Sequence, residues 1–262
     1  MIRRILVCAA LALTACSGGA SGNAGAPYDP RTLPTGPVGE SIAHGYAIIV
    51  QTHRLMKAYV RADLTCADCH IAAGTQSRGG SFVGVYGRFP QWNKRAHRVI
   101  ALQDRIAECF LYSMNGRAPA YTSKAMIAIV AYIAWLSRGT PIGAKQPASD
   151  RYIEPLPSAS PNAARGAALY REKCAACHGR DGQGVSRVYP PLWGPRSFND
   201  LAGMAHADRM TGFVRYNMPQ DAPGSLTLAQ AYDIAAFVLS RPRPHFRKNA
   251  LVQTPPLPAK YF

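Results

Sequence analysis

At 262 residues, the chain is long enough to form two compact domains. Its 30 basic and 14 acidic residues give a formal net charge of +16, which favours anionic partners. The basic residues form no tail or stripe and no nucleic-acid-binding motif is present, so the sequence predicts no nucleic-acid partner.

The N-terminus has the pattern of an exported lipoprotein. Two arginines precede an apolar run over residues 5–15, which is too short to span a bilayer. Leu-Thr-Ala then precedes Cys16 in the order of a bacterial lipobox, so we predict a signal peptide over 1–16 and a membrane anchor through lipid at Cys16. An ordinary signal peptide is the alternative. Ser17 favours the outer membrane facing the periplasm, and the Gly-, Ser- and Pro-rich residues 17–38 predict a flexible tether.

Residues 39–145 form the first predicted domain. The segment "ESIAHGYAIIVQTHRLMKAYV" predicts an amphipathic helix, since one face recurs at steps of three and four through Ile42, Tyr46, Ile49, His53 and Met56. The motif Cys66-Ala-Asp-Cys69-His70 follows, and a Gly- and Pro-rich loop region comes after it.

Two further helices are predicted in this domain. A short helix around Cys109 is indicated by the spacing of Val99, Leu102, Ile106 and Phe110. The apolar segment "TSKAMIAIVAYIAWLSRG" predicts the last helix, which Thr122 or Ser123 can cap.

A Pro-rich linker over residues 146–161 separates this domain from a second copy over residues 162–262. The copy begins with "NAARGAALYREK", a predicted helix with Asn162 as its cap, and continues into Cys174-Ala-Ala-Cys177-His178. Its last helix is predicted in "TLAQAYDIAAFVLSR", with Thr227 as the cap. The Pro-rich tail beyond it predicts irregular structure along the surface.

Both C-x-x-C-H motifs match the attachment signature of c-type haem. Two thiols at this spacing can form thioethers with the two vinyl groups of one porphyrin, and the adjacent histidine can bind the iron. A zinc site would need further ligands at finger spacing, and a pair of disulfides would leave both histidines unexplained. We therefore predict two covalently bound haem c groups, at Cys66, Cys69 and His70 and at Cys174, Cys177 and His178.

This order of helix, C-x-x-C-H, loop, ligand and final helix resembles a class I cytochrome c domain from about residue 40 to the C-terminus. The segments "RGAALYREKCAACHG" and "YPPLWG" of the second copy look like signatures of that family. The predicted fold class is all-α, with two class I cytochrome c domains in tandem.

A sixth iron ligand is expected in each copy. In the second copy Met218, which lies 40 residues beyond His178 and is followed by proline, is the favoured candidate. Its rivals, Met204, Met210 and His206, come earlier in the loop, and a core methionine is the structural alternative.

The same distance in the first copy leads to Cys109, which lies 39 residues beyond His70. Met114 and His97 are its rivals, and a buried free cysteine is the structural alternative. Thiolate ligation lowers the potential of a haem, so Cys109 would make the first haem the site where electrons enter and the second their exit.

Basic and hydroxyl side chains are expected around Cys109. On a helix, Arg105, Cys109 and Ser113 would share one stripe. Arg95 and Arg98 lie upstream and could close over the same pocket, although each arginine could equally be a solvated surface charge or a haem-propionate partner.

The chain resembles the tetrathionate-forming thiosulfate dehydrogenases, which are dihaem c-type cytochromes, in "RFPQWNKRA", "DRIAECFLYSMNG", "YNMP" and "DIAAFVLSRPRPHF". The resemblance implies that Cys109 ligates the active-site haem and that Arg95, Arg105 and Ser113 line a thiosulfate pocket. It departs from the family in Tyr112, where a basic residue is expected. It departs again in the residue before Met218, which is asparagine here and lysine in some members.

The residues suit that chemistry. Joining two thiosulfate dianions into tetrathionate releases two electrons, which two haems can hold, and arginines would offset the repulsion between the dianions. The Cys109 sulfur is also a candidate for a transient S–S bond with substrate. The expected acceptor is a small redox protein such as a soluble cytochrome c. Reversal as a tetrathionate reductase, a non-enzymatic dihaem shuttle, and the cysteine-ligated haem subunit of a sulfur-oxidising carrier complex remain alternatives.

Overall fold

The computed structural model describes residues 29–147, 150–153 and 155–246. The predicted signal peptide, the lipid site Cys16, most of the tether and the end of the C-terminal tail lie outside these residues. Across the part of the chain that is described, none of the helices combines the length and the apolar character needed to cross a membrane.

The first domain is built on a crossing of two helices, α1 (Pro37–Val50) and α5 (Lys124–Leu136). Gly45 lies at the crossing, where a Cβ atom would sit 2.0 Å from the carbonyl oxygen of Ala128. Only glycine permits this approach of the two backbones. Of the two predicted caps, Ser123 is the one used, since its hydroxyl accepts from the Met126 N–H at 3.2 Å.

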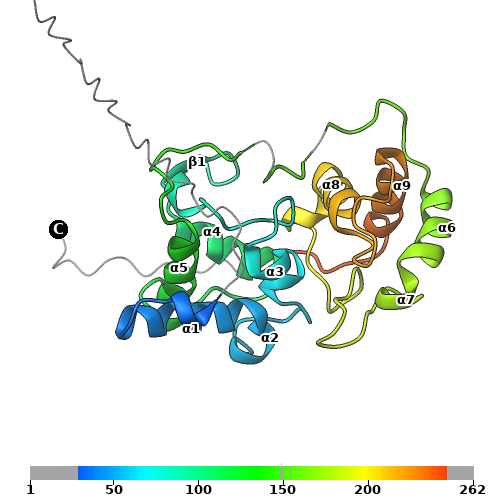
Figure 1. Ribbon diagram of the computed structural model, residues 1–262. Coiled ribbons are helices and arrows are strands. Elements are labelled where there is room, and N and C mark those ends of the chain that lie inside the picture. Colours follow the sequence, from blue (N-terminus) through cyan, green and yellow to red (C-terminus); the bar gives the residue numbers. More distant parts are fainter. Residues whose placement is uncertain (1–28, 148–149, 154, 247–262) are drawn as a thin grey trace, which may run out of the picture.

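The second domain repeats this arrangement with α6 (Ala163–Lys173) and α9 (Leu228–Leu239). A Cβ atom on Gly166 would lie 2.0 Å from the carbonyl oxygen of Asp233. The predicted caps are confirmed: Asn162 accepts from the Arg165 N–H at 2.9 Å, and Thr227 caps α9. Figure 1 shows the two helix crossings at opposite ends of the molecule.

Shorter elements fill the space between the two crossings. They are η1 (Pro30–Thr32), α2 (Thr52–Leu55), η2 (Cys66–Asp68), α3 (Ile71–Gly74), η3 (Tyr86–Arg88), β1 (Gln91–Asn93), β2 (Arg98–Ile100), α4 (Leu102–Glu108), the π-helix η4 (Cys109–Ser113), α7 (Ala175–His178), η6 (Gly203–Ala205) and α8 (Ala207–Asn217).

The first predicted helix is shorter than its sequence pattern suggests. The chain leaves helical geometry at Gln51, and Met56 lies beyond α2. The Thr52 hydroxyl, which is buried, donates to the Ile48 carbonyl and accepts the Cys66 N–H at 3.0 Å. The break therefore joins the end of α1 to the start of the first C-x-x-C-H motif.

The fold is mostly helical, but it contains a two-stranded antiparallel hairpin that the all-α prediction missed. Val99, which was predicted to lie in a helix, belongs to β2, opposite Trp92. Both side chains are exposed, so no buried face marked these strands in the sequence.

The two domains touch through segments that follow the haem motifs. The chain after α9 runs back toward the first domain (Figure 1). There the Phe246 ring lies 5.0 Å from that of Tyr112, and the Phe246 N–H donates to Asp200. Residues 242–246 have no regular structure, as predicted for the start of the tail.

Replacing Gly45 or Gly166 by alanine should destabilise the corresponding domain by about 1–3 kcal/mol, because the new methyl group forces two backbones apart. Thermal unfolding of the haem-loaded protein measures the effect. Gly203→Ala is the matched control, since the nearest atoms there belong to the movable side chain of Arg209. Crossing variants that unfold no earlier than this control would contradict the close-approach account.

Candidate active site

The first C-x-x-C-H motif lines a cavity of about 580 Å³, a volume typical of a ligand site. Cys66, Cys69 and His70 share the cavity with Cys109, Ser113 and Met114. The rest of the lining is chiefly apolar and includes Ile49, Leu64, Phe82, Ile106, Phe110, Ile129 and Ile133. Burial raises the pKa of the Cys66 thiol to about 12 and also raises that of Cys69, so both thiols are uncharged.

His70 is held as a neutral imidazole. Its Nδ1 lies 2.5 Å from the Gly80 carbonyl oxygen, and its ring stacks on Phe82 with the centroids 4.2 Å apart. Burial lowers the pKa of His70 to about 4. Because Nδ1 donates to the carbonyl, Nε2 keeps its lone pair for a metal, the usual arrangement of a ligating histidine. The motif and its apolar cavity thus fit a haem.

The chain turns sharply straight after His70. Ala72 and Ala73 adopt left-handed backbone angles, with φ of 52° and 55°, which cost L-residues about 1–2 kcal/mol each. The turn is held by the buried Tyr132 hydroxyl, which donates to the Ala73 carbonyl at 2.9 Å. Gly74 follows with φ of 84°, and a Cβ atom there would overlap the Phe82 ring. The final helix of the domain thereby secures the loop that carries Gly80.

Cys109 begins the π-helix η4, where the sequence predicted one continuous helix. The Met114 N–H donates at 2.9 Å to the Cys109 carbonyl, five residues back. Single π turns in helices are frequent at functional sites. Cys109 keeps its predicted helical spacing from Arg105 in α4, and Ser113 ends the π-helix. Of the two rival ligands, Met114 lines the cavity and His97 does not.

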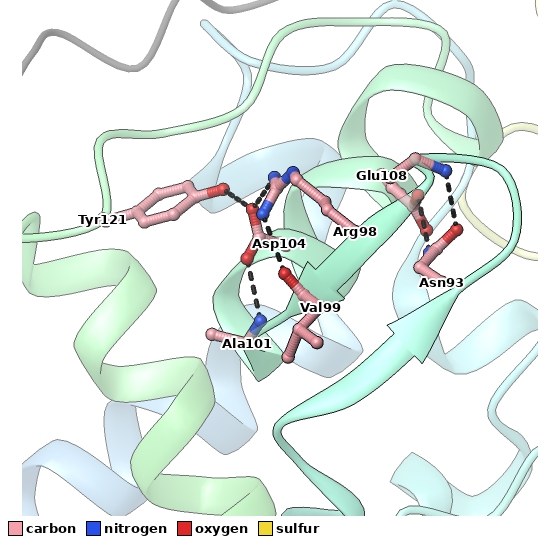
Figure 2. A network of polar contacts seen from close by, with 8 residues as sticks. Asn93, Arg98, Val99, Ala101, Asp104, Glu108 and Tyr121 are labelled. Carbon is pink, nitrogen blue, oxygen red and sulfur yellow. Dashed lines mark hydrogen bonds and ion pairs between the residues drawn. The ribbon is translucent and has the colours of Figure 1, made fainter.

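Arg105 and Glu108 flank Cys109 in sequence and form an ion pair with a 2.8 Å separation. The Cys109 sulfur is the main influence that raises the pKa of the Arg105 guanidinium. Glu108 also accepts from the Asn93 amide at 3.1 Å, as Figure 2 shows. Asn93 in turn accepts the backbone N–H of Arg95 at 2.8 Å. Glu108, which sequence analysis missed, therefore connects Arg105 to the turn that carries Arg95.

The upstream arginines take different positions. Arg95 is exposed and does not line the cavity, and its guanidinium lies 4.6 Å from the centre of the Tyr112 ring. Tyr112, noted as a departure from the family pattern, thus supports the predicted substrate-binding arginine. Arg98 points elsewhere and pairs with Asp104 at 2.6 Å (Figure 2).

Asn199 of the second domain closes the end of the π-helix. Its buried amide donates to the Leu111 carbonyl at 2.9 Å and to the Asn115 side chain at 3.3 Å. Its backbone N–H donates to the Tyr112 carbonyl at 3.1 Å. Carbonyls at the end of a helix lack partners within the helix, and Asn199 supplies them. No local pattern could reveal this role, since its side-chain partners lie 88 and 84 residues away.

Tyr152 and Arg209 are two more side chains that sequence analysis missed. Burial raises the pKa of the Tyr152 hydroxyl, as do the sulfurs of Cys69 and Cys109. The positive charges of Arg209 and Arg105 oppose this rise. Tyr152 comes from the linker and Arg209 from α8, so the electrostatic field around Cys109 includes groups outside the first domain.

The second C-x-x-C-H motif has a matching histidine arrangement. His178 is buried, and its Nδ1 lies 3.0 Å from the Pro190 carbonyl oxygen. Burial lowers the pKa of His178 and raises that of Cys174 to about 11. Cys177 is half-buried beside them in α7. This motif therefore fits a haem on the same grounds as the first.

Met218 follows the last residue of α8 and packs, half-buried, against the core. Among its rivals, Met210 is buried within α8, whereas His206 is exposed at the start of that helix. Met204 lies in η6, close to the π-helix of the first domain.

Comparison with family models defines the class of the protein. The SoxA/TsdA cytochrome c domain matches residues 56–142, and the cytochrome c oxidase cbb3-type subunit III model matches residues 161–238. The chain therefore consists of two cytochrome c domains, a class that implies haem c.

The chain belongs to the thiosulfate dehydrogenase family. It is 42% identical to the thiosulfate dehydrogenase of Allochromatium vinosum over 82% of this chain and 83% of the relative. With that of Stutzerimonas stutzeri it shares 36% identity over 83% of this chain and 72% of the relative. The solved thiosulfate dehydrogenase (TsdBA) of Marichromatium purpuratum superposes with a TM-score of 0.79 at 34% identity. That match covers 83% of this chain and 49% of the solved one, so the present chain spans about half of that protein.

Asp104 should make the region around α4 sensitive to acid. Burial would raise the pKa of Asp104, but hydrogen bonds from Arg98, Tyr121 and the Ala101 N–H outweigh it and hold the pKa below its ordinary value (Figure 2). A depressed carboxyl pKa stabilises the fold above the unfolded-state pKa, and this contribution is lost as pH falls through the folded-state pKa.

We therefore expect Asp104→Asn to cost about 1–3 kcal/mol at neutral pH, from the loss of a charged hydrogen-bond acceptor. The variant should also lose less stability than the wild type between pH 6 and pH 3. Thermal unfolding across this range measures both effects. Parallel pH profiles for the two proteins would contradict the assignment.

Proposed function

We propose that the chain oxidises two thiosulfate ions to one tetrathionate at the first haem site and passes the electrons through the second to an external acceptor. The observation that carries this proposal is the placement of Cys109 in one cavity with Cys66, Cys69 and His70, beside the positive charge of Arg105. Relatives that carry the name thiosulfate dehydrogenase match across both domains and support it.

The proposed cofactors are two covalent haem c groups. Thioethers would form at Cys66 and Cys69 in one domain and at Cys174 and Cys177 in the other. The proposed iron ligands are His70 with Cys109 and His178 with Met218. Each haem supplies a one-electron acceptor, so the pair holds the two electrons that the reaction releases.

Cys109 is preferred to Met114 as the sixth ligand of the first haem. Both side chains line the cavity, but only the sulfur of Cys109 influences Cys66, Cys69 and Arg105 electrostatically. A thiolate beside a guanidinium is also the stable charge state in an apolar cavity, because the two charges compensate each other.

Substrate binding is assigned to Arg95, Arg105 and Ser113. Two thiosulfate dianions repel each other, so their approach requires fixed cations, and the planar guanidinium group binds oxyanions bidentately. The Glu108 ion pair orients Arg105, and the Asn93 turn orients the backbone at Arg95. Ser113 offers a hydroxyl from the same π-helix as Cys109.

The wider setting is also proposed. Residues 39–145 would hold the active-site haem and residues 162–262 the electron-transfer haem, with 146–161 as the linker. The sequence up to residue 38 would export the protein to the periplasm and tether it to the outer membrane through lipid at Cys16. The acceptor would be a small redox protein such as a soluble cytochrome c.

Arg105→Gln should lower kcat/KM for thiosulfate about 100-fold, the scale seen when one preorganised donor is removed from an active site. Tetrathionate formed from thiosulfate and ferricyanide measures the rate. Arg98→Gln is the matched control, since Arg98 pairs with Asp104 outside the cavity and should retain nearly full activity.

Cys109→Ala, loaded with both haems, should lose turnover by a larger factor than Arg105→Gln. A wild-type protein that transfers electrons but forms no tetrathionate would instead establish a non-enzymatic shuttle. Turnover only with a partner's carrier peptide would indicate the haem subunit of a carrier complex.

A further inference from the structure

Asn217 occupies the boundary between the two haem sites. It is the last residue of α8 and directly precedes Met218. Its side chain is only 2% exposed, so its amide must find partners within the protein. Those partners come mainly from the first domain.

The Asn217 amide makes three hydrogen bonds. Its oxygen accepts from the Gln76 amide at 2.9 Å, and its nitrogen donates to the Arg78 carbonyl at 2.9 Å. The same nitrogen donates to the Phe213 carbonyl within α8 at 3.1 Å. Only a side chain that both donates and accepts can make this set of bonds, which excludes aspartate and leucine as equivalents.

The loop that Asn217 binds is the loop that orients His70. Residues 71–80 leave this histidine and return, and the Gly80 carbonyl lies 2.5 Å from its Nδ1. The Ile71 N–H donates to the Gly79 carbonyl at 2.8 Å and closes the loop. A Cβ atom at Gly79 would approach Asn217 Oδ1 to 3.2 Å, so the loop and the amide are closely packed.

We propose that Asn217 is a positioning residue that couples the two haem sites through this loop. A continuous path of covalent and hydrogen bonds runs from Met218 through Asn217 and the Arg78 carbonyl to Gly80 and His70. The distal side of one site and the proximal side of the other are thereby held by one amide. The proposal rests on the proposed function only in taking His70 and Met218 as iron ligands.

Asn217→Leu should shift the midpoint potentials of both haems, because the variant releases Met218 and loosens the carbonyl that polarises His70. We expect about a tenfold change in at least one reduction equilibrium, or about 59 mV for a one-electron couple. Potentiometric titration of the haem-loaded protein measures this without substrate. Gln220→Leu is the matched control, since Gln220 is exposed and also lies close to Met218 in sequence, and its potentials should not move.

Gln76→Ala removes one bond of the bridge from the first domain and leaves the α8 bond of Asn217 intact. It should shift the potentials in the same direction, and the double variant should shift them by less than the sum of the two singles. Asn199→Ala breaks a different contact between the domains, at the π-helix, and should affect the first haem alone.

A shift confined to the second haem in Asn217→Leu, or strictly additive effects in the double variant, would overturn the coupling. The ligand assignment fails separately, if Met218→Leu leaves the charge-transfer band of a methionine-ligated ferric haem unchanged. The proposed function fails separately too, if the wild type forms no tetrathionate.

Discussion

The hydrogen bond between His70 Nδ1 and the Gly80 carbonyl is the contact on which the first site depends. It fixes the imidazole so that Nε2 can face a metal, and it closes the loop that begins with a left-handed turn. The strain of that turn is offset by the buried hydroxyl of Tyr132, which belongs to the last helix of the domain. The same loop then offers Arg78 to Asn217. One carbonyl thus links iron ligation, the domain core and the domain interface.

The first site is not confined to the first domain. Asn199 bonds to the end of the π-helix that begins at Cys109, and Asn217 bonds to the loop behind His70. Two buried amides of the second domain therefore hold the two predicted ligands of the first haem from different directions. An enzyme that sends electrons from one haem to another benefits from this arrangement, because rigid contacts fix the geometry between donor and acceptor.

The sequence predicted those parts of the fold that depend on local chemistry. Helix caps such as Asn162 and Thr227 were identified because a cap bonds to residues three positions away. Motif spacing likewise led to Cys109, and the structure places it in the cavity with His70. The exposed hairpin was missed because its strands have no buried face. The π-helix and the role of Asn199 were missed because both depend on partners distant in sequence.

The central claim is that the first haem has a sulfur ligand from Cys109 and the second has one from Met218. Low-temperature EPR of the fully oxidised, haem-loaded protein tests this claim most directly, because thiolate/His and Met/His ligation give different low-spin ferric signals. The account predicts one signal of each kind, with the thiolate signal lost in a protein that lacks the thiol. Two Met/His signals in the wild type would contradict it and would favour Met114 as the ligand in the first domain.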